Sequence, residues 1–441
     1  LDLSIERLDE DDVRWADLVG ISVPMHTAAR LGVRVAERVR VLNDGAHICF
    51  YGLYASFHAD VLLGAENSDG ASRWHGRALA DSVIGGEFES PLVELAARLD
   101  AADHGVGLAA LDGVRARTGD GGVFLGRQAS LLPRRDLLPA LDRYARVDIG
   151  GDQRLVGYVE ASRGCAHRCL HCPITPVYGG RLRITTQDVV LDDVRQLVAM
   201  GAQHITFGDP DFFNGIRHSL RIVEAMHAEF PLLTFDATIK VEHVLEHRRQ
   251  IPTLAANGCL FIVSAVEAVH DHILMNFEKG HTAADVVEAL AIVGSAGIPL
   301  RPTFVAFTPW TGLEDYLELL DFVDSRGLLH HVDSIQLAIR LLVPRGSSLV
   351  GTPAMDRVLG PFDEGTFSYS WRHSDPRVDR LQGAVAVAVE QATRDGIGAE
   401  ATFERISALA HAAAGRRVPV RAGAGPVPIA PVPRLTEPWF C

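Results

Sequence analysis

Three cysteines lie close together in the short segment GCAHRCLHC. Cys165, Cys169 and Cys172 are separated by three residues and then by two, and His167 and His171 lie among them. A cubane of four irons needs a ligand on each iron, so three clustered thiolates leave one iron open for a substrate or cofactor. The spacing therefore predicts a [4Fe-4S] cluster with a reactive open iron.

The alternative is a structural zinc site in which His167 or His171 completes a tetrahedron. Zinc loops usually draw on two separated ligand pairs, and the sequence contains no second pair. We expect Cys49 and Cys259, which lie in apolar segments, to be buried packing residues. One cluster plus isolated cysteines makes a poor disulfide framework, which favours a reducing, cytosolic setting.

Composition limits the class of protein. The chain has 441 residues, enough for two or three domains, and its 47% hydrophobic and 22% charged residues are typical of globular proteins. A net charge of −14 argues against broad affinity for nucleic acid. The apolar runs are too short to span a membrane. No signal-peptide pattern is visible, although the sequence starts at Leu1 rather than Met.

The cysteines follow the first of six apolar segments that alternate with amphipathic ones. Strands are predicted at 156–161, 203–208, 232–238, 259–264, 300–307 and 332–339. Helices are predicted near 185–200, 215–228, 241–256, 282–296 and 312–326. This alternation predicts a partial (β/α)6 TIM barrel. Because catalytic residues of such barrels gather at the carboxyl ends of the strands, the cysteine segment is well placed for an active site.

We divide the chain into five parts. Residues 1–110 alternate short strands with helices, which predicts an α/β domain with a parallel sheet. The remaining parts are a connector (111–150), the barrel (151–350), a helical C-terminal region (351–415) and a proline-rich extended tail that ends in Cys441 (416–441).

The segment SRGCAHRCLHC resembles the signature of the radical S-adenosylmethionine (SAM) enzymes, and the resemblance extends over about residues 155–345. It implies that the open iron chelates the amino and carboxylate groups of SAM. It also implies that the reduced cluster donates an electron to the sulfonium and breaks a carbon–sulfur bond, with a protein such as flavodoxin or ferredoxin as the electron donor. His171 occupies the family's aromatic position near the SAM adenine.

Other barrel segments resemble further motifs of this family. ITFGDPDFF lies where the family often has a Gly-Gly-Glu-like motif, which implies that Asp209 and Asp211 accept hydrogen bonds from the SAM amino group. The alternative is an Asp that caps the next helix. FIVSAVEAVHDHIL lies where the family reads Gly-Ile-Glu-Ser, which implies that Glu267 orients SAM and that Ser264 donates a further hydrogen bond.

Two more polar residues follow in the barrel. Lys279, in MNFEKGHT, is expected to be a solvated residue at a helix start. Gln336 and Arg340 have the even spacing that places side chains on one side of a strand. That parity favours either a polar stripe facing the cavity, with Gln336 as a cofactor contact, or residues at the edge of the core.

The first hundred residues resemble the flavodoxin-like, cobalamin-binding domain that precedes many radical SAM barrels, in the stretches GISVPMHTA and SVIGGEFE. The family's Asp-x-His-x-x-Gly motif, which supplies a cobalt ligand, does not occur in the chain. We therefore expect the domain fold and leave cobalamin as an open alternative.

The ending PRLTEPWFC resembles a radical SAM subfamily named for its Cys-Sec-Ala-Glu-Pro or Cys-Cys-Ala-Glu-Pro tail. The sequence stops at Cys441, where that motif would begin, as a selenocysteine codon read as a stop would cause. A terminal Cys-Sec or Cys-Cys pair would offer two soft ligands, which suit a thiophilic centre, so Cys441 is the candidate catalytic residue. The resemblance includes the radical SAM enzyme of arsinothricin biosynthesis, which implies transfer of the 3-amino-3-carboxypropyl group of SAM to arsenite. The alternatives are a cobalamin-dependent radical methyltransferase, a peptide-modifying enzyme and a zinc-stabilised binding protein.

Overall fold

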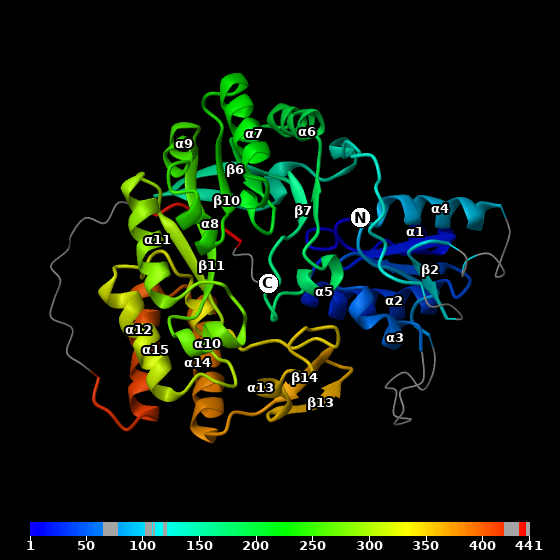
Figure 1. The fold of residues 1–441 in the computed structure, drawn as a ribbon. Coiled ribbons are helices and arrows are strands. Elements are labelled where there is room, and N and C mark those ends of the chain that lie inside the picture. Colours follow the sequence, from blue (N-terminus) through cyan, green and yellow to red (C-terminus); the bar gives the residue numbers. More distant parts are fainter. Residues whose placement is uncertain (65–77, 102–107, 109–110, 118–120, 419–431, 438–441) are drawn as a thin grey trace.

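The computed structural model contains two main β-sheets, a small one in the N-terminal part and a larger, curled one in the middle of the chain (Figure 1). It describes all residues except 65–77, 102–107, 109–110, 118–120, 419–431 and 438–441. Within this described part, no helix is long and apolar enough to cross a membrane.

The N-terminal sheet has the strand order β1-β2-β3-β4, with β1 to β3 parallel and β4 antiparallel. Its strands are β1 (Leu18–Ser22), β2 (His47–Tyr51), β3 (Ser82–Ile84) and β4 (Val114–Ala116). The helices of this part are α1 (Glu10–Trp15), α2 (His26–Leu42), α3 (Ala59–Leu62) and α4 (Glu89–Asp100), with the 3₁₀ turn η1 (Ser56–His58). A flavodoxin-like sheet has the strand order 2-1-3-4-5, which differs from the order observed here. The flavodoxin-like assignment of residues 1–110 therefore stays a prediction.

The larger sheet has seven strands in the order β12-β11-β10-β9-β6-β5-β15. Five of them, which are parallel, are β6 (Asp152–Val159), β9 (His204–Phe207), β10 (Thr234–Thr238), β11 (Cys259–Glu267) and β12 (Leu300–Phe304). They confirm the first five predicted barrel strands. The antiparallel edge consists of β5 (Arg146–Ile149) and β15 (Arg434–Leu435). The predicted connector thus pairs with both sheets, through β4 and β5.

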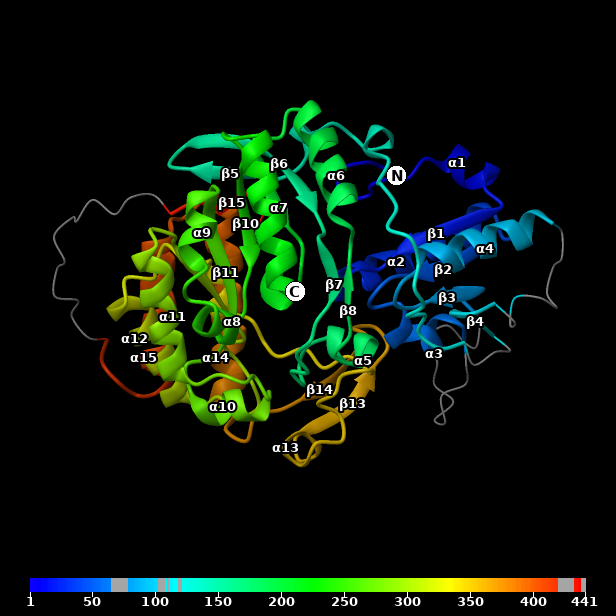
Figure 2. The same cartoon turned by 45° about the horizontal axis from the view of Figure 1, so that its top comes forward.

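Helices line the outer side of the curled sheet (Figures 1 and 2). They are α6 (Gln187–Ala199), α7 (Ile216–Glu229), α8 (Val241–Glu246), α9 (Ile251–Ala256), α10 (Asp271–Asn276), α11 (Ala283–Ser295) and α12 (Leu313–Ser325). In α6, the buried residues Val190, Val194 and Leu197 recur at helical spacing and pack against the sheet. The barrel strands and these helices share one hydrophobic core.

The prediction of a sixth strand at 332–339 is wrong. The segment forms a 3₁₀ turn, η6 (Ser334–Leu337), and joins the barrel only through an isolated parallel bridge between Phe307 and Arg340. Side chains satisfy backbone groups that a strand ladder would use: Gln336 Oε1 accepts from the Phe304 N–H at 3.0 Å, and the Tyr316 hydroxyl donates to the Leu337 carbonyl. The even-spacing argument for Gln336 and Arg340 therefore fails.

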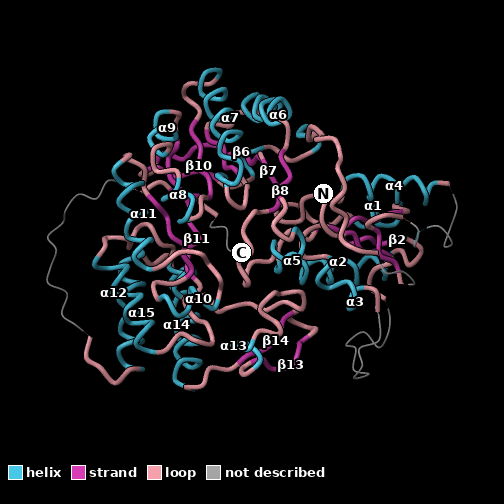
Figure 3. Tube along the Cα trace, in the orientation of Figure 1, coloured by secondary structure: helices cyan, strands magenta, loops and turns pink. Residues whose placement is uncertain are grey.

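The rest of the described chain closes the molecule. A small unit of α13 (Pro353–Asp356), β13 (Leu359–Asp363) and β14 (Ser368–Trp371) lies between the α10 end of the barrel and the N-terminal part (Figure 3). The helices α14 (Pro376–Arg394) and α15 (Ala399–Ala413) agree with the second part of the predicted helical region 351–415, whose first part instead contains β13 and β14. The two helices pack against each other and the barrel. Two 3₁₀ turns, η3 (Arg135–Leu137) and η4 (Leu141–Arg143), precede β5.

Candidate active site at the cysteine loop

The three clustered cysteines lie in a loop at the carboxyl end of β6. The loop is closed at its base by a short antiparallel hairpin, β7 (Ser162–Gly164) and β8 (Leu182–Ile184), and it contains α5 (Ile174–Tyr178). Gly164, directly before Cys165, has φ +75°, and a Cβ atom there would lie 2.3 Å from the Arg181 carbonyl oxygen. Only glycine allows this close approach, so the hairpin depends on it.

The loop is tied to neighbouring barrel segments on both sides of the cysteines. The Asn214 side chain, in the 3₁₀ turn η5 (Phe212–Gly215) after β9, donates to Cys165 Sγ at 3.4 Å and accepts from the Ala166 N–H at 3.2 Å. The Leu170 N–H donates to the Phe277 carbonyl at 2.9 Å. The loop is thus held at the mouth of the barrel.

All three loop cysteines are free thiols, and they lie close enough for their charges to interact. Burial raises the pKa of Cys172 to about 12, and the charges of Cys169 and Cys165 add to this effect while Lys279 opposes it. Burial, with the nearby Asp211 and Cys169, also raises the pKa of Cys165. Thiolates forced together in a buried place are stable only with positive charge between them, which is what a metal centre supplies.

A buried charged network lies beside the thiols, at the end of β11. Glu267 Oε1 accepts from Lys279 Nζ at 2.9 Å and lies 3.1 Å from His171 Nε2. Burial by itself would raise the pKa of Glu267, but the ammonium of Lys279 and the imidazole of His171 outweigh it and hold this pKa far below its usual range. The prediction of a solvated Lys279 is wrong, because its side chain is only 5% exposed.

The backbone of β11 is bent to present Glu267. The pairing of β11 with β12 shifts register between Ala265 and Glu267, and Glu267 has φ +68°, a left-handed conformation that is rare outside glycine. Such strain persists only where the surrounding structure enforces it, and it is most common at functional sites. The sequence motif identified Glu267, whereas the bulge and the buried cation were not visible in it.

The two acids after β9 have protein partners. Asp209 Oδ2 accepts from the Ala161 N–H at 2.9 Å and Oδ1 from the Ser162 hydroxyl at 2.5 Å, and burial raises the pKa of Asp209 to about 7. Asp211 caps η5 through the Phe213 N–H, which is the capping alternative considered for it. Contact of either acid with SAM stays a prediction.

The remaining predicted site residues differ in whether their polar atoms have a hydrogen-bond partner. Ser264 is fully buried on β11, and its hydroxyl has no hydrogen-bond partner among the described residues, as is also true of His171 Nδ1. Gln336 is engaged by Phe304, and Cys441 lies outside the described residues. Cys49 and Cys259 are buried, as expected for packing residues.

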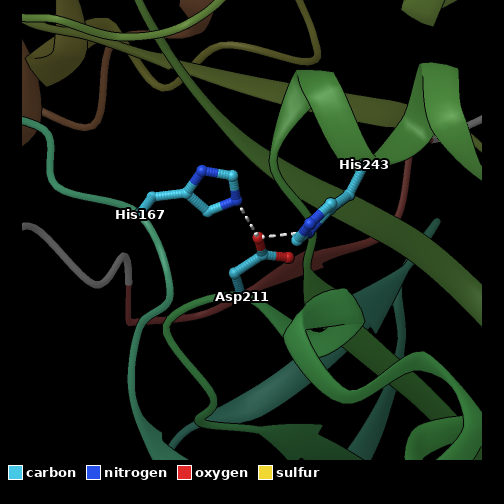
Figure 4. Close-up of side chains that lie close together, drawn as sticks. All are labelled: His167, Asp211 and His243. Atoms are coloured by element: carbon cyan, nitrogen blue, oxygen red, sulfur yellow. Dashed lines mark ion pairs between the residues drawn. The ribbon is translucent and has the colours of Figure 1, made fainter. Parts of the chain in front are cut away.

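The sequence analysis missed two residues of this region, Lys240 and His243. Lys240 is buried and its Nζ lies 3.1 Å from His167 Nδ1, while His243 lies on α8 and faces Asp211 (Figure 4). Their only signal in the sequence was a position just after the third barrel strand, where barrel enzymes place functional residues.

Side chains of the N-terminal part and of the cysteine loop pack together at their junction, beside a cavity of about 310 Å³ lined by Phe57, Val177 and Arg345. Val177 and Tyr178 of α5 belong to the same core as Tyr54 and Phe57, which follow β2. The Tyr178 hydroxyl donates to Glu87 Oε1 at 2.8 Å. Ligands of open α/β sheets bind at these carboxyl ends of the strands, which is where this junction lies. Cobalamin at this junction therefore stays an open alternative.

Comparison with known proteins agrees with this geometry. Residues 159–323 match the family model described as Radical SAM superfamily. This stretch of the chain is therefore similar to a radical SAM domain. The match spans β9 to β12, the cysteine loop and the Glu267 network, and it identifies the chain as an enzyme and removes the alternative of a zinc-stabilised binding protein.

Curated relatives of the chain include transferases. Hopanoid C-3 methylase of Methylococcus capsulatus is 27% identical over 239 residues, which cover 54% of this chain and 44% of the methylase. Ribosomal protein uS12 methylthiotransferase RimO of Roseobacter denitrificans is 26% identical over 208 residues, 44% of each chain. The chain thus spans about half the length of these relatives.

Two solved structures have a similar fold. The cobalamin-dependent SAM radical enzyme OxsB, with aqua-cobalamin bound, has a TM-score of 0.64 and 16% identity over 87% of this chain and 60% of that chain. The radical SAM methyltransferase TsrM of Kitasatospora setae has a TM-score of 0.55 and 19% identity over 70% of this chain and 60% of that chain. At these identities the likeness concerns the fold.

Proposed function

We propose that this protein is a radical SAM transferase in which Cys165, Cys169 and Cys172 hold a [4Fe-4S] cluster and the barrel mouth binds SAM. The observation that carries the proposal is the convergence of three free thiols, one buried and two half-buried, with the charged network of Glu267, Lys279 and His171. When bound, the cluster supplies one electron to the sulfonium of SAM. A flavodoxin or ferredoxin would deliver that electron.

The chain's own residues would position the reactants. Lys279 places a buried positive charge near Cys172, which opposes the rise in the pKa of this thiol that burial causes. Ser264 Oγ and His171 Nδ1 are buried polar atoms without described partners, so they are available to hydrogen-bond a ligand. We assign them to SAM, with Glu267 orienting the ring of His171.

Iron analysis after anaerobic reconstitution tests the cluster. We expect about four irons per chain in a brown protein, since three thiolates can hold one cubane. Cys165→Ala, Cys169→Ala and Cys172→Ala should each lose most of this iron, whereas Cys49→Ala, which changes a cysteine buried in the N-terminal sheet, should keep it. A colourless protein that binds zinc, or iron retained by the triple variant, would contradict the proposal.

The transferred group and its acceptor form the finer part of the proposal: the 3-amino-3-carboxypropyl group of SAM and arsenite, with Cys441 delivering the arsenic. The support is the direction of β15. It is antiparallel to β5, which is antiparallel to β6, so β15 runs with β6 toward the cysteine loop. Its pairing places Leu435 opposite Val147, and Cys441 follows six residues later, a reach of at most about 20 Å.

Product analysis of SAM turnover, with and without arsenite, tests this part. We expect a carbon–arsenic product together with 5′-methylthioadenosine, because transfer of the aminocarboxypropyl group leaves that fragment. Cys441→Ser should abolish the arsenic product and leave the iron content unchanged. Formation of 5′-deoxyadenosine alone, with arsenite unconsumed, would refute it.

Cobalamin-dependent methyl transfer is the second candidate, and the similarity to OxsB and TsrM favours it. The absence of the Asp-x-His-x-x-Gly motif from the sequence argues against a cobalt-ligating histidine of that type. Gel filtration of the purified protein with hydroxocobalamin discriminates the two, and we expect the cobalamin to elute separately. Co-elution of one cobalamin per chain would instead establish the methyltransferase candidate.

A further inference from the structure

A second cluster of ligand-type side chains lies beside the cysteine loop. It consists of His167 from the loop, Asp211 after β9 and His243 from α8 (Figure 4). Asp211 Oδ2 lies 2.7 Å from His243 Nδ1 and 3.7 Å from His167 Nε2, and the two ring centroids are 4.7 Å apart. One ligand atom from each residue lies within 4.8 Å of the other two.

The three facing atoms share a second property. His167 Nε2, Asp211 Oδ2 and His243 Nδ1 are all buried, and none makes a hydrogen bond within the described part of the chain. The other oxygen of Asp211, by contrast, accepts from the Phe213 N–H at 3.2 Å and the Lys240 N–H at 3.4 Å, which fixes the carboxylate with Oδ2 toward the histidines. Asp211 Oδ2 is in ion-pair contact with His243 Nδ1 and with His167 Nε2, so the three buried atoms face one point that a single cation could occupy.

The surroundings resemble the outer contacts of a metal site. His167 Nδ1 lies 3.5 Å from Glu242 Oε2 and 3.1 Å from Lys240 Nζ, and Lys240 and Glu242 form a salt bridge. When a cation binds at Nε2, Glu242 is within reach to accept a hydrogen bond from His167 Nδ1–H, the arrangement usual for ligating histidines, and Lys240 would keep its salt bridge with Glu242. The carboxylates of Asp211 and Glu242 and the ammonium of Lys240 together give this region a net negative charge.

A path to solvent continues from His243. His243, Glu246 and His247 form another group whose ligand atoms lie within 4.8 Å, and the side chain of Glu246 is 67% exposed. Because these residues are three and four positions apart at the end of α8, they lie on one face of the helix. The cluster therefore continues toward the surface through further side chains of the metal-ligating type.

We propose that His167, Asp211 and His243 bind one divalent transition-metal ion, such as Zn²⁺ or Fe²⁺, at a site separate from the [4Fe-4S] cluster. Two imidazoles and one carboxylate are the ligands that such ions take in proteins, with further positions open to water or a ligand. The three ligands come from the cysteine loop, the β9 turn and α8, so the ion ties the loop to the barrel. Without an ion, Asp211 and His243 would form an ion pair only.

Titration with Co²⁺ alone tests the site, in the full chain carrying Cys165→Ala, Cys169→Ala and Cys172→Ala so that no loop thiol can bind the probe. We expect one equivalent of Co²⁺ to bind, with the ligand-field absorption of nitrogen and oxygen ligands. Adding His243→Ala or Asp211→Asn should abolish this binding. Adding His218→Ala, which removes a buried histidine of α7 outside the cluster, should leave it unchanged.

Two controls make the outcome decisive. Circular dichroism verifies that each variant is folded, and Zn²⁺ should raise the thermal unfolding midpoint of the triple variant and not of the form with Asp211→Asn. No Co²⁺ binding by the folded triple variant, or equal binding after Asp211→Asn and His243→Ala, would overturn the proposal. The iron content of the unmodified chain reports separately on the [4Fe-4S] proposal, so the two can fail independently.

Discussion

Replacing Lys279 by Met should destabilise the barrel strongly, because it leaves Glu267 buried without its ammonium partner. The two side chains are 5% and 10% exposed and 2.9 Å apart. Breaking a buried ion pair by removing one partner typically costs about 3–5 kcal/mol. His171 Nε2 remains 3.1 Å from Glu267 Oε1, so we expect the lower end, about 3 kcal/mol.

Urea unfolding of the iron-free protein, followed by circular dichroism, measures this cost. The matched control is the double variant Lys279→Met with Glu267→Leu, which replaces both charges by apolar side chains. Replacing a buried pair in this way is often neutral or stabilising, so the double variant should recover most of the loss, about 2 kcal/mol or more.

The size of the coupling between Lys279 and Glu267 decides whether the two residues form a buried ion pair in solution. If the cost of Lys279→Met falls below about 1 kcal/mol, the pair behaves like an exposed salt bridge and the burial argument fails. If the double variant is as unstable as the sum of the two single variants, the charges are not coupled. Glu267→Gly should be more stable than Glu267→Ala by about 1 kcal/mol, because φ is +68° at this position.

Three further predictions concern pH and the loop. Burial raises the pKa of Asp209 to about 7, so the stabilisation by the protonated acid is complete below its unfolded pKa of 3.8 and is lost as the pH rises through 7. In urea unfolding, Asp209→Asn should therefore become more stable than the parent by about 2–4 kcal/mol as the pH rises from about 5 to 8. Burial lowers the pKa of His58 to about 3, so the parent protein loses stability as the pH falls below the unfolded pKa of 6.5, by about 2 kcal/mol near pH 5. Thermal unfolding should show that His58→Leu lacks this loss. Gly164→Ala should destabilise the protein by at least about 2 kcal/mol and reduce bound iron, whereas Gly151→Ala, also at positive φ but with no heavy atom within 4 Å of the added Cβ, should keep the iron.

Local pattern was enough to predict the barrel strands and the cysteine loop. The first five barrel strands and the helices between them follow from runs of apolar residues, whose period reflects which face is buried. The spacing of Cys165, Cys169 and Cys172 indicated an open-sided cluster because ligand geometry within one short loop is a local property. The prediction of the sixth strand failed because the Gln336 side chain accepts from the Phe304 N–H of β12 and the Tyr316 hydroxyl donates to the Leu337 carbonyl, in place of a strand ladder.

The site beyond the cysteines was decided by tertiary structure. His171 and Glu267 meet across 96 residues, and Lys279 is drawn into the core although its neighbours in the sequence indicate a helix start. His243 faces Asp211 and His167 only because α8, the β9 turn and the cysteine loop converge at one end of the sheet. Amino-acid types and spacing record the period of each element and its ligand chemistry. Which distant charges share a buried volume depends on how those elements pack.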